Sequence, residues 1–316
     1  MAHRELGPAT LAVVQAVVAA VTSSDTHLLV ACSGGADSLA LAYATGHVGR
    51  RRLIPTGAVV VDHGLQPGSA AVAERTVEQL RDLGFTEVAV RRVEVTDTGR
   101  GPEGAARSAR YAALAELART RRSTVLLGHT LDDQAETVLL GLARGSGTRS
   151  LAGMAPRAAG LLRPLLGLRR TTTAQTCVEL GLQPWADPQN VDPEFSRVRV
   201  RRQVLPMLEH ELGPGVAEAL ARTAGLARDD ADLLDRLAAE ADPGRDDLAV
   251  TVLTELPRAL RTRLIRRWLH RHGAAEIGQQ HVVRVEELVL DWHGQGPAQL
   301  PGVVVQRIDG ALHVIG

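Results

Sequence analysis

The sequence contains no lysine, so all 36 of its basic residues are arginines. Chemistry that needs a lysine side chain is therefore excluded, including a Schiff base, the phosphate-binding lysine of a Walker A loop and a covalent lysine adenylate. A composition rich in alanine, arginine and glycine explains this absence most simply. The 36 acidic residues balance the arginines, so the chain has no net charge that would attract nucleic acid or a membrane, and RNA binding must come from local patches.

Cysteines are also few, because the chain has only Cys32 and Cys177, which form no CxxC pair. This spacing excludes a zinc ribbon, a thioredoxin motif and a cysteine-ligated iron–sulfur cluster, and it favours a reducing cytoplasm. Aromatic residues make up 2% of the sequence, so we expect an aliphatic core and no broad base-stacking platform. No apolar run reaches the ~18 residues of a membrane span. We therefore expect a soluble, cytoplasmic protein with no membrane partner.

Length and patterning predict two domains. The chain has 316 residues, about twice the size of a typical domain. Short aliphatic runs that are typical of strands alternate with stretches of helical spacing, and the runs lie at residues 28–32, 58–61, 88–95 and 125–127. This alternation predicts an α/β fold with a parallel sheet and a ligand crevice at the carboxyl ends of its strands.

The pattern changes between Pro206 and Pro214, and we place the domain boundary near Gly213. A long amphipathic stretch begins just after it. Near the end of the chain, Asp309-Gly310 separates two apolar runs, which is a strong signal for a hairpin. We therefore predict a larger domain at residues 1–213 and a smaller mixed α+β domain at residues 214–316, with a long linking helix, further helices and a C-terminal hairpin.

The most informative motif follows the first predicted strand, which leads through Ser33-Gly34-Gly35-Ala36-Asp37-Ser38 directly into a helix. Two glycines permit a tight turn, and the backbone N–H groups at a helix N-terminus bind anions. An acid beside such a turn, here Asp37, suits Mg²⁺ held on phosphates. A turn whose Ser and Asp only cap the helix would explain each residue singly, but it accounts less well for the complete pattern.

A second polar group follows the fourth predicted strand. His129, Asp133 and Glu136 are spaced i, i+4 and i+7, which would place them on one face of a helix. Such a face can bind a metal or transfer a proton, although a polar face taken alone is more often simply solvated. The next region, residues 144–156, is rich in Gly, Ser and Arg, and its composition is compatible with an ordered functional loop or a flexible one.

Together these motifs resemble a known family. The Ser33–Ser38 loop is similar to the PP-loop of the N-type ATP pyrophosphatases, which have an adenine nucleotide alpha hydrolase-like domain and cleave ATP between its α and β phosphates. The segments that begin at His129 and Arg144 resemble the HxxxDxxETxL and RGxGxxGLxGMxP elements of the tRNA(Ile)-lysidine synthetases. Further resemblance lies at residues 61–65, 103–111, 163–166 and 185–190, so it covers roughly residues 28–206. The chain resembles the short, two-domain form of that family.

The resemblance implies an ATP-dependent ligase that forms a carbon–nitrogen bond. ATP adenylates the C2 carbonyl of the wobble cytidine in the isoleucine tRNA with a CAU anticodon, pyrophosphate leaves, and the amine of free L-lysine displaces AMP to give lysidine. The implied cofactors are ATP and Mg²⁺, and the implied partners are the tRNA and lysine. Because members of the family are often dimers, a homodimer is one option for the assembly.

Roles for individual residues follow from the resemblance and from their chemistry. The expected catalytic residues are Asp37, His129, Asp133 and Glu136. Among these, Asp37 and Asp133 are expected to hold Mg²⁺, and Asp133, Glu136 and His129 to recognise the cationic lysine or take its proton. The expected ATP-binding residues are Ser33, Gly34, Gly35, Ala36, Asp37, Ser38, Asp62 and His63. The expected tRNA-binding residues are Arg107, Arg110, Arg197, Arg199 and Arg201.

Some of these roles have alternatives. Arg107 and Arg110 are equally consistent with plain surface residues, and His63 with a packed loop histidine. A second arginine cluster lies on a predicted helix and is compatible with tRNA phosphate contacts or with a solvated helix face; it comprises Arg261, Arg263, Arg266, Arg267 and Arg271. The chain departs from the family at Val198, where Asn is usual, so a local hydrogen bond of that Asn is missing.

Three other functions are less consistent with the sequence. A tRNA thiolase of the same superfamily normally needs a cysteine pair or cluster, which Cys32 and Cys177 do not form. A non-catalytic ATP-binding module would need neither Asp37 nor the acids after the fourth strand. An amidating synthetase of small molecules would leave the arginine-rich second domain unexplained.

Overall fold

The computed structural model describes residues 6–62, 68–92, 101–145, 147–275 and 277–315, with the backbone alone for residues 101–108. The chain forms two compact units, residues 1–225 and 226–316. They divide within a long helix, α10 (Val216–Glu240), and not in the turn near Gly213. The first turns of α10 belong to the first unit because Ala217 is buried in a cluster with Leu131 and Ala135. Within the described ranges, no helix combines the length and apolar character needed to cross a membrane.

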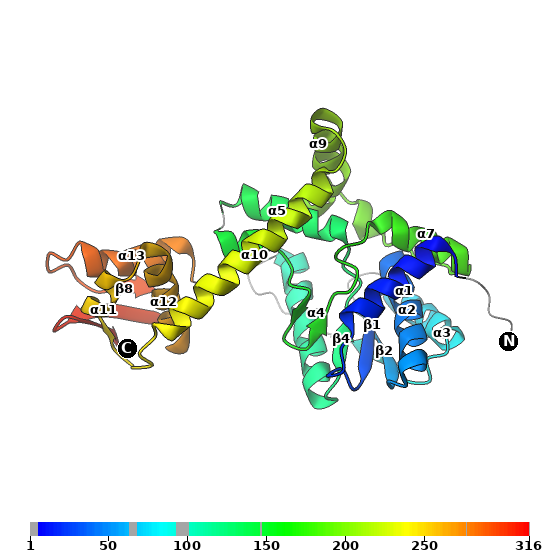
Figure 1. The fold of residues 1–316 in the computed structure, drawn as a ribbon, viewed down its shortest axis with the longest axis horizontal. Coiled ribbons are helices and arrows are strands. Elements are labelled where there is room, and N and C mark those ends of the chain that lie inside the picture. Colours follow the sequence, from blue (N-terminus) through cyan, green and yellow to red (C-terminus); the bar gives the residue numbers. More distant parts are fainter. Residues whose placement is uncertain (1–5, 63–67, 93–100, 146, 276, 316) are drawn as a thin grey trace. The chain divides into compact units, whose positions relative to one another are not determined.

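The first unit contains a six-stranded sheet with the strand order β3-β2-β1-β4-β6-β5, in which only β5 runs antiparallel (Figure 1). Its strands are β1 (Leu28–Cys32), β2 (Thr56–Asp62), β3 (Val88–Arg92), β4 (Thr124–Leu126), β5 (Arg157–Ala158) and β6 (Leu161–Leu162). The predicted parallel α/β fold is confirmed. Because β2 and β4 lie on opposite sides of β1, the strand order switches direction there, and such a point opens a crevice at the carboxyl ends of the strands.

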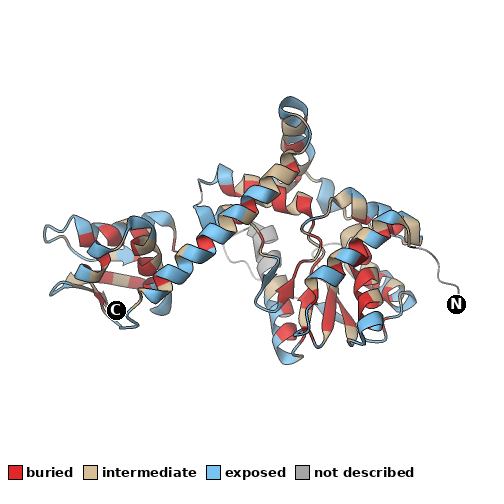
Figure 2. Ribbon diagram, viewed as in Figure 1, coloured by how far each residue is buried: buried red, intermediate tan, exposed pale blue. Residues whose placement is uncertain are grey.

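Helices cover both faces of this sheet, which explains the unbroken apolar run of β1. Leu28, Val30 and Cys32 lie in one core with residues of α1 and α2, whereas Leu29 lies in a second core with Leu114 of α4. The buried strands at the centre of the first unit are visible in Figure 2. The helices of this unit are α1 (Pro8–Ala20), α2 (Ala36–Arg52), α3 (Ser69–Asp82), α4 (Gly101–Thr120), α5 (Leu131–Ala143), α6 (Thr148–Leu151), α7 (Arg170–Leu180), α8 (Ser196–Arg199) and α9 (Leu205–Leu212).

The Gly-, Ser- and Arg-rich region has regular structure where it is described. It forms α6, and the backbone of Met154 is tied to α5 through both polar atoms of the Gln134 side chain. The Gln134 amide donates to the Met154 carbonyl at 3.1 Å, and the Met154 N–H donates to Gln134 Oε1 at 2.8 Å. Composition alone could not decide between an ordered and a flexible loop, because Gln134, the partner that orders this region, lies on another helix.

The second unit is a small α+β domain, as predicted. Its antiparallel sheet has the strand order β7-β10-β9-β8 and consists of β7 (Leu248–Ala249), β8 (Ala298–Leu300), β9 (Val303–Ile308) and β10 (Ala311–Ile315). Its remaining helices are α11 (Val250–Glu255), α12 (Arg258–Arg271) and α13 (Gln279–Leu290). Asp309 and Gly310 both adopt positive φ angles, of 47° and 78°, and connect β9 to β10 as the predicted hairpin.

The arginines of α12 are engaged within the second unit. The Arg261 guanidinium is buried and lies 2.9 Å from Glu286 of α13. Arg263 pairs with Asp235 at 2.9 Å, and Arg267 and Arg271 both pair with Asp242, at 3.1 and 2.9 Å. These contacts favour a structural role for the cluster over the contacts with tRNA phosphates that the sequence left open.

Replacing Glu286 by Gln should destabilise the second unit, because Arg261 would then be a buried charge without its counter-ion. We expect the free energy of unfolding to fall by about 3 kcal/mol, as measured by urea denaturation followed by tryptophan fluorescence. Glu287→Gln, at the exposed neighbouring position, serves as the control. Equal losses in the two variants would contradict a stabilising role for the buried pair.

Candidate active site

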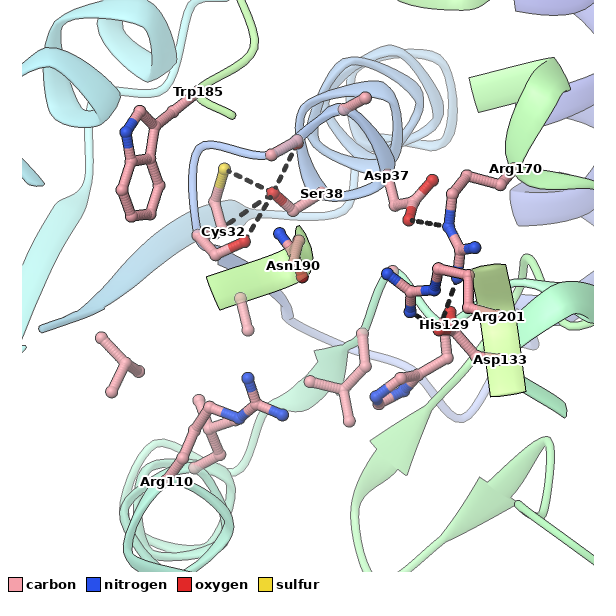
Figure 3. Close-up of a pocket in the computed structure, with 18 residues that line it drawn as sticks. Cys32, Asp37, Ser38, Arg110, His129, Asp133, Arg170, Trp185, Asn190 and Arg201 are labelled. Atoms are coloured by element: carbon pink, nitrogen blue, oxygen red, sulfur yellow. Dashed lines mark hydrogen bonds and ion pairs between the residues drawn. The ribbon is translucent and has the colours of Figure 1, made fainter. Parts of the chain in front are cut away.

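A cavity of ≈ 400 Å³ opens at the carboxyl ends of β1, β2 and β4, where the switch in strand order predicts a crevice. This volume lies within the range of small-molecule sites. The loop after β1, the segment after β4 and the start of α7 all contribute to its walls, and Arg110 reaches toward it from α4 (Figure 3). The cavity therefore gathers most of the residues that the sequence singles out.

The predicted phosphate loop forms the turn between β1 and α2. Gly34 has a φ of +83°, and a Cβ there would approach the Thr76 hydroxyl to 2.5 Å, so glycine is required on two grounds. Ser38 Oγ accepts from the Ser33 N–H at 3.2 Å and donates to the Gly35 carbonyl at 2.9 Å, which closes the turn. Gly35 is the N-cap of α2. Because glycine has no side chain, no N-cap side chain accepts hydrogen bonds from the N–H groups of the first turn. The turn is therefore shaped to receive an anion.

Most of the expected ATP-binding residues border this cavity. Ser33, Gly35, Ala36, Asp37 and Ser38 line it. Gly34 does not line it, and its carbonyl accepts the N–H of Trp185 at 2.9 Å. Asp62 ends β2 beside Val61, which lines the cavity, and His63 is outside the described residues. The side chain of Arg107 is likewise outside them.

Asp37 lies in the first turn of α2, between two partners on α7. The Thr173 hydroxyl donates to Asp37 Oδ1, and Arg170 Nε lies 3.6 Å from Oδ2. Burial raises the pKa of Asp37 to about 6, and the negative charge of Asp133 adds to the rise against the effect of Thr173 and Arg170. Asp37 is thus a carboxylate that is held partly out of water, close to a second carboxylate.

Thr130 and Asp133 fix the start of α5. The Thr130 N–H donates to Asp133 Oδ2 at 2.8 Å, and the Asp133 N–H donates back to Thr130 Oγ1 at 3.5 Å, which is a capping box. The other carboxylate oxygen, Oδ1, lies 2.8 Å from Arg170 Nη2. Burial acts to raise the pKa of Asp133, but the charge of Arg170 and the bond from Thr130 outweigh it and hold the pKa below its usual value.

His129 does not share a helical face with Asp133 and Glu136, contrary to the spacing argument. Thr130 is the N-cap of α5 with an extended backbone, so His129 lies before the helix, in the segment after β4. It still lines the cavity, with its ring 6.5 Å from that of Tyr111 and nearly parallel to it. The capping box explains the difference, because it ends the extended segment at Thr130 and starts the helix one residue later.

Glu136 is fully buried at the centre of a cluster of three arginines. Its carboxylate oxygens lie 2.7 Å from Arg201 Nε, 3.1 Å from Arg197 Nε and 3.3 Å from Arg170 Nη2. Arg170, Arg197 and Arg201 thus balance the charges of Glu136, Asp133 and Asp37. Within this structure Arg197 and Arg201 contact protein carboxylates, and Arg199 donates to the Pro193 and Glu194 carbonyls at 2.7 Å; their role in tRNA binding stays a prediction.

Arg170 was not singled out by the sequence, although it touches all three carboxylates. It is the first residue of α7, directly after Arg169. Two cations at a helix N-terminus oppose the helix dipole, so this placement needs carboxylate partners elsewhere. That unfavourable placement is the signal from which a buried acidic partner could have been inferred.

A second, smaller cavity of ≈ 210 Å³ lies on the other side of this cluster. Arg170 and Arg201 line both cavities and so form the wall between them. The other lining residues of the smaller cavity are Asp132, Glu136, Arg169, Leu205, Pro206, Glu209 and Ala217. Its charged lining thus consists of three carboxylates and three guanidiniums, a composition that can hold an ion carrying both charges.

Two family models match this chain. One is described as a PP-loop domain and matches residues 10–208, and the other as a TilS substrate binding domain and matches residues 248–313. The chain is 54% identical to the tRNA(Ile)-lysidine synthase of Leifsonia xyli over 90% of this chain and 88% of that protein. It is 53% identical to the enzyme of the same name from Thermobifida fusca, over 91% of both chains. The counterpart from Mycobacterium tuberculosis is 51% identical over 90% of this chain and 89% of that one.

Among solved structures, the U34-tRNA thiolase NcsA from Methanococcus maripaludis, determined with its [4Fe-4S] cluster, is similar with a TM-score of 0.57. The similarity covers 70% of this chain and 80% of the thiolase at 18% sequence identity. At that identity the likeness supports the fold alone.

Asp37→Asn should make the protein more stable at neutral pH, because the raised pKa of Asp37 means that folding favours its protonated form. Protonation of Asp37 contributes fully to the free energy of unfolding below the pKa of Asp37 in the unfolded chain, near 4. This contribution is lost as the pH rises through about 6. We expect the variant to gain about 1–2 kcal/mol at pH 7.5 and little at pH 4. Urea denaturation at both pH values measures the difference. An equal gain at the two pH values, or the same behaviour in the exposed-site control Asp82→Asn, would contradict this account.

Proposed function

Because this chain belongs to the tRNA(Ile)-lysidine synthase family, we propose that it adenylates the wobble cytidine of the isoleucine tRNA with a CAU anticodon and then joins free L-lysine to it. The observation that carries the proposal is the meeting of the phosphate loop with Asp37, His129 and Asp133 at one cavity. Such a site offers an anion cradle, carboxylates and a base at one cavity. Bond formation between lysine and C2 of cytidine would make the enzyme a carbon–nitrogen ligase.

The phosphate loop holds the leaving pyrophosphate. The N–H groups at the start of α2 and the hydroxyls of Ser33 and Ser38 face the cavity from one end, and a helix N-terminus favours negative charge. Arg170 and Arg201 add two guanidiniums to the same cavity. These groups would stabilise the charge that develops on the pyrophosphate as the α–β bond of ATP breaks.

Asp37 and Asp133 are the residues that would hold Mg²⁺. Among the described residues, no group of three or more His, Cys, Asp and Glu side chains could hold a metal by itself. A pair of carboxylates is nevertheless sufficient, because Mg²⁺ usually binds one or two protein carboxylates together with substrate phosphates and water. Asp37 Oδ2 and Asp133 Oδ1 lie 3.6 and 2.8 Å from the Arg170 guanidinium, so an ion shared by the two carboxylates would replace Arg170 between them. When bound, the ion would neutralise phosphate charge.

Lysine would bind in the smaller cavity, whose mixed charges suit an amino acid zwitterion. A guanidinium that lines this cavity can pair with the carboxylate of lysine, and Asp132 can pair with its α-ammonium group. The side-chain ammonium would extend toward Glu136 and Asp133, separated from the nucleotide only by Arg170 and Arg201. His129 lines the nucleotide cavity and can accept the proton that the amine must lose before it attacks.

The second unit would recognise the tRNA, since the match to the substrate binding domain covers most of it. Residues 248–313 lie outside the unit that carries the cavity, so they are available to distinguish tRNAs that share the CAU anticodon. A thiolase activity has less support. Burial raises the pKa of the Cys32 thiol and raises that of Cys177 to about 11, so neither is poised as a thiolate.

Incorporation of labelled lysine into the CAU-anticodon isoleucine tRNA tests the proposal. With ATP and Mg²⁺ present, we expect lysine incorporation together with AMP and pyrophosphate, and loss of all three with Asp37→Asn. AMP formation on addition of tRNA without lysine incorporation would keep the adenylation step and point to a different nucleophile. If tRNA stimulates no AMP formation at all, the proposed function is wrong.

The smaller cavity can be tested separately. Asp132→Asn should raise the KM for lysine about tenfold, since one charge-assisted contact is worth roughly 1.5–3 kcal/mol, and should leave the KM for ATP within about twofold. Steady-state kinetics with each substrate varied in turn measure the two values. Glu211→Gln, an exposed position on α9, is the control. An equal rise in both KM values would place lysine elsewhere.

A further inference from the structure

Arg169 connects the smaller cavity to helix α10. Its Nη2 lies 3.1 Å from Asp132 Oδ1, at the start of α5, and its Nη1 lies 2.9 Å from Glu218 Oε1, in the first turn of α10. Glu209 Oε1 lies 3.9 Å from the same Nη1. The Arg169 guanidinium is therefore shared between Asp132, which lines the cavity, and Glu218, which lies on α10 and does not line it.

The start of α10 is itself part of the cavity. Glu209 accepts the N–H groups of Gly215, Val216 and Ala217, at 2.7, 3.2 and 3.0 Å, so it caps the helix that it precedes. Ala217 lines the cavity and is buried against Leu131 of α5. A displacement of the first turn of α10 would therefore change the cavity wall and pull on Arg169.

Helix α10 is continuous across the division between the two units. It runs from Val216 to Glu240, and the units divide after Gly225. A helical connection is semi-rigid, unlike a flexible Gly- and Ser-rich linker. Its C-terminal part belongs to the unit that contains the match to the substrate binding domain.

We propose that the Arg169–Glu218 ion pair couples tRNA binding to lysine binding: tRNA on the second unit shifts α10, Arg169 follows Glu218, and Asp132 is released to hold the lysine ammonium. Arg169 thus acts as a positioning residue that competes with lysine for Asp132 until tRNA is present. The inference rests on the proposed function, because it takes lysine as the ligand of the smaller cavity and tRNA as the ligand of the second unit. Lysine would then be held tightly only when its acceptor is bound.

The coupling is measured as the ratio of the lysine dissociation constants without and with the tRNA. Equilibrium dialysis with labelled lysine, full-length protein and no ATP avoids turnover. We expect saturating CAU-anticodon isoleucine tRNA to tighten lysine binding by about fivefold or more, the usual lower size of a coupling between sites. In Glu218→Gln the ratio should fall below twofold, while the lysine dissociation constant without tRNA and the affinity for tRNA stay within twofold of those of the unaltered protein.

Asp230→Asn is the matched control, because Asp230 is an exposed acid three turns further along α10, and it should keep the full coupling. The inference is overturned if tRNA leaves lysine binding unchanged in the unaltered protein, or if Glu218→Gln keeps the full ratio. Equal weakening of lysine binding with and without tRNA in Glu218→Gln would also overturn it, because Glu218 would then only shape the cavity. Failure of lysine or tRNA to bind the unaltered protein at all would instead count against the proposed function.

Discussion

The buried carboxylate of Glu136 is the constraint on which the candidate site depends. A fully buried charge is costly unless it is paired, and Glu136 has three guanidinium partners, from α7, α8 and the π-helical turn (Val200–Val204) that follows α8. Each of these arginines is thereby drawn inward from a segment that would otherwise be a surface loop or a helix end. The cluster holds α5, α7 and the segment before α9 together, and so it creates the wall that separates the two cavities.

This arrangement gives the three acids of the site different properties. Asp133 and Glu136 are surrounded by arginines, and the pKa of Asp133 lies below its usual value. Asp37 is farther from the guanidiniums, and burial raises its pKa to about 6. Environments that separate the pKa values of neighbouring acids are typical of sites in which one group must stay ionised while another responds to its ligand.

In the smaller domain and at the start of α10, arginines form ion pairs that join one helix to another. On α12 they form pairs such as Arg261–Glu286 that hold the helices of the second unit together, and Arg169 joins α5 to α10. A planar guanidinium can serve two or three carboxylates at once, which an ammonium group does less well. In a chain without lysine, the same side chain therefore supplies the structural ion pairs and the charges that face the cavities.

The sequence by itself determined the features that depend on neighbouring residues. The parallel α/β fold follows from the alternation of apolar runs, the phosphate turn from Gly34 and Gly35 between a strand and a helix, and the hairpin from Asp309-Gly310. Local propensity and backbone geometry are sufficient for these.

Only the tertiary structure decided the contacts between residues far apart in the chain. It placed His129 before α5 through the capping box of Thr130. It also turned Arg197 and Arg201 toward Glu136, which lies more than 60 positions earlier in the sequence. It also brought Arg170 to the three acids and formed a second cavity between α5, α7 and α10. An arginine in a sequence carries the same charge whether it faces RNA, solvent or a buried acid. The partner that an arginine contacts depends on the long-range packing that buries a carboxylate. A local sequence pattern does not indicate that packing.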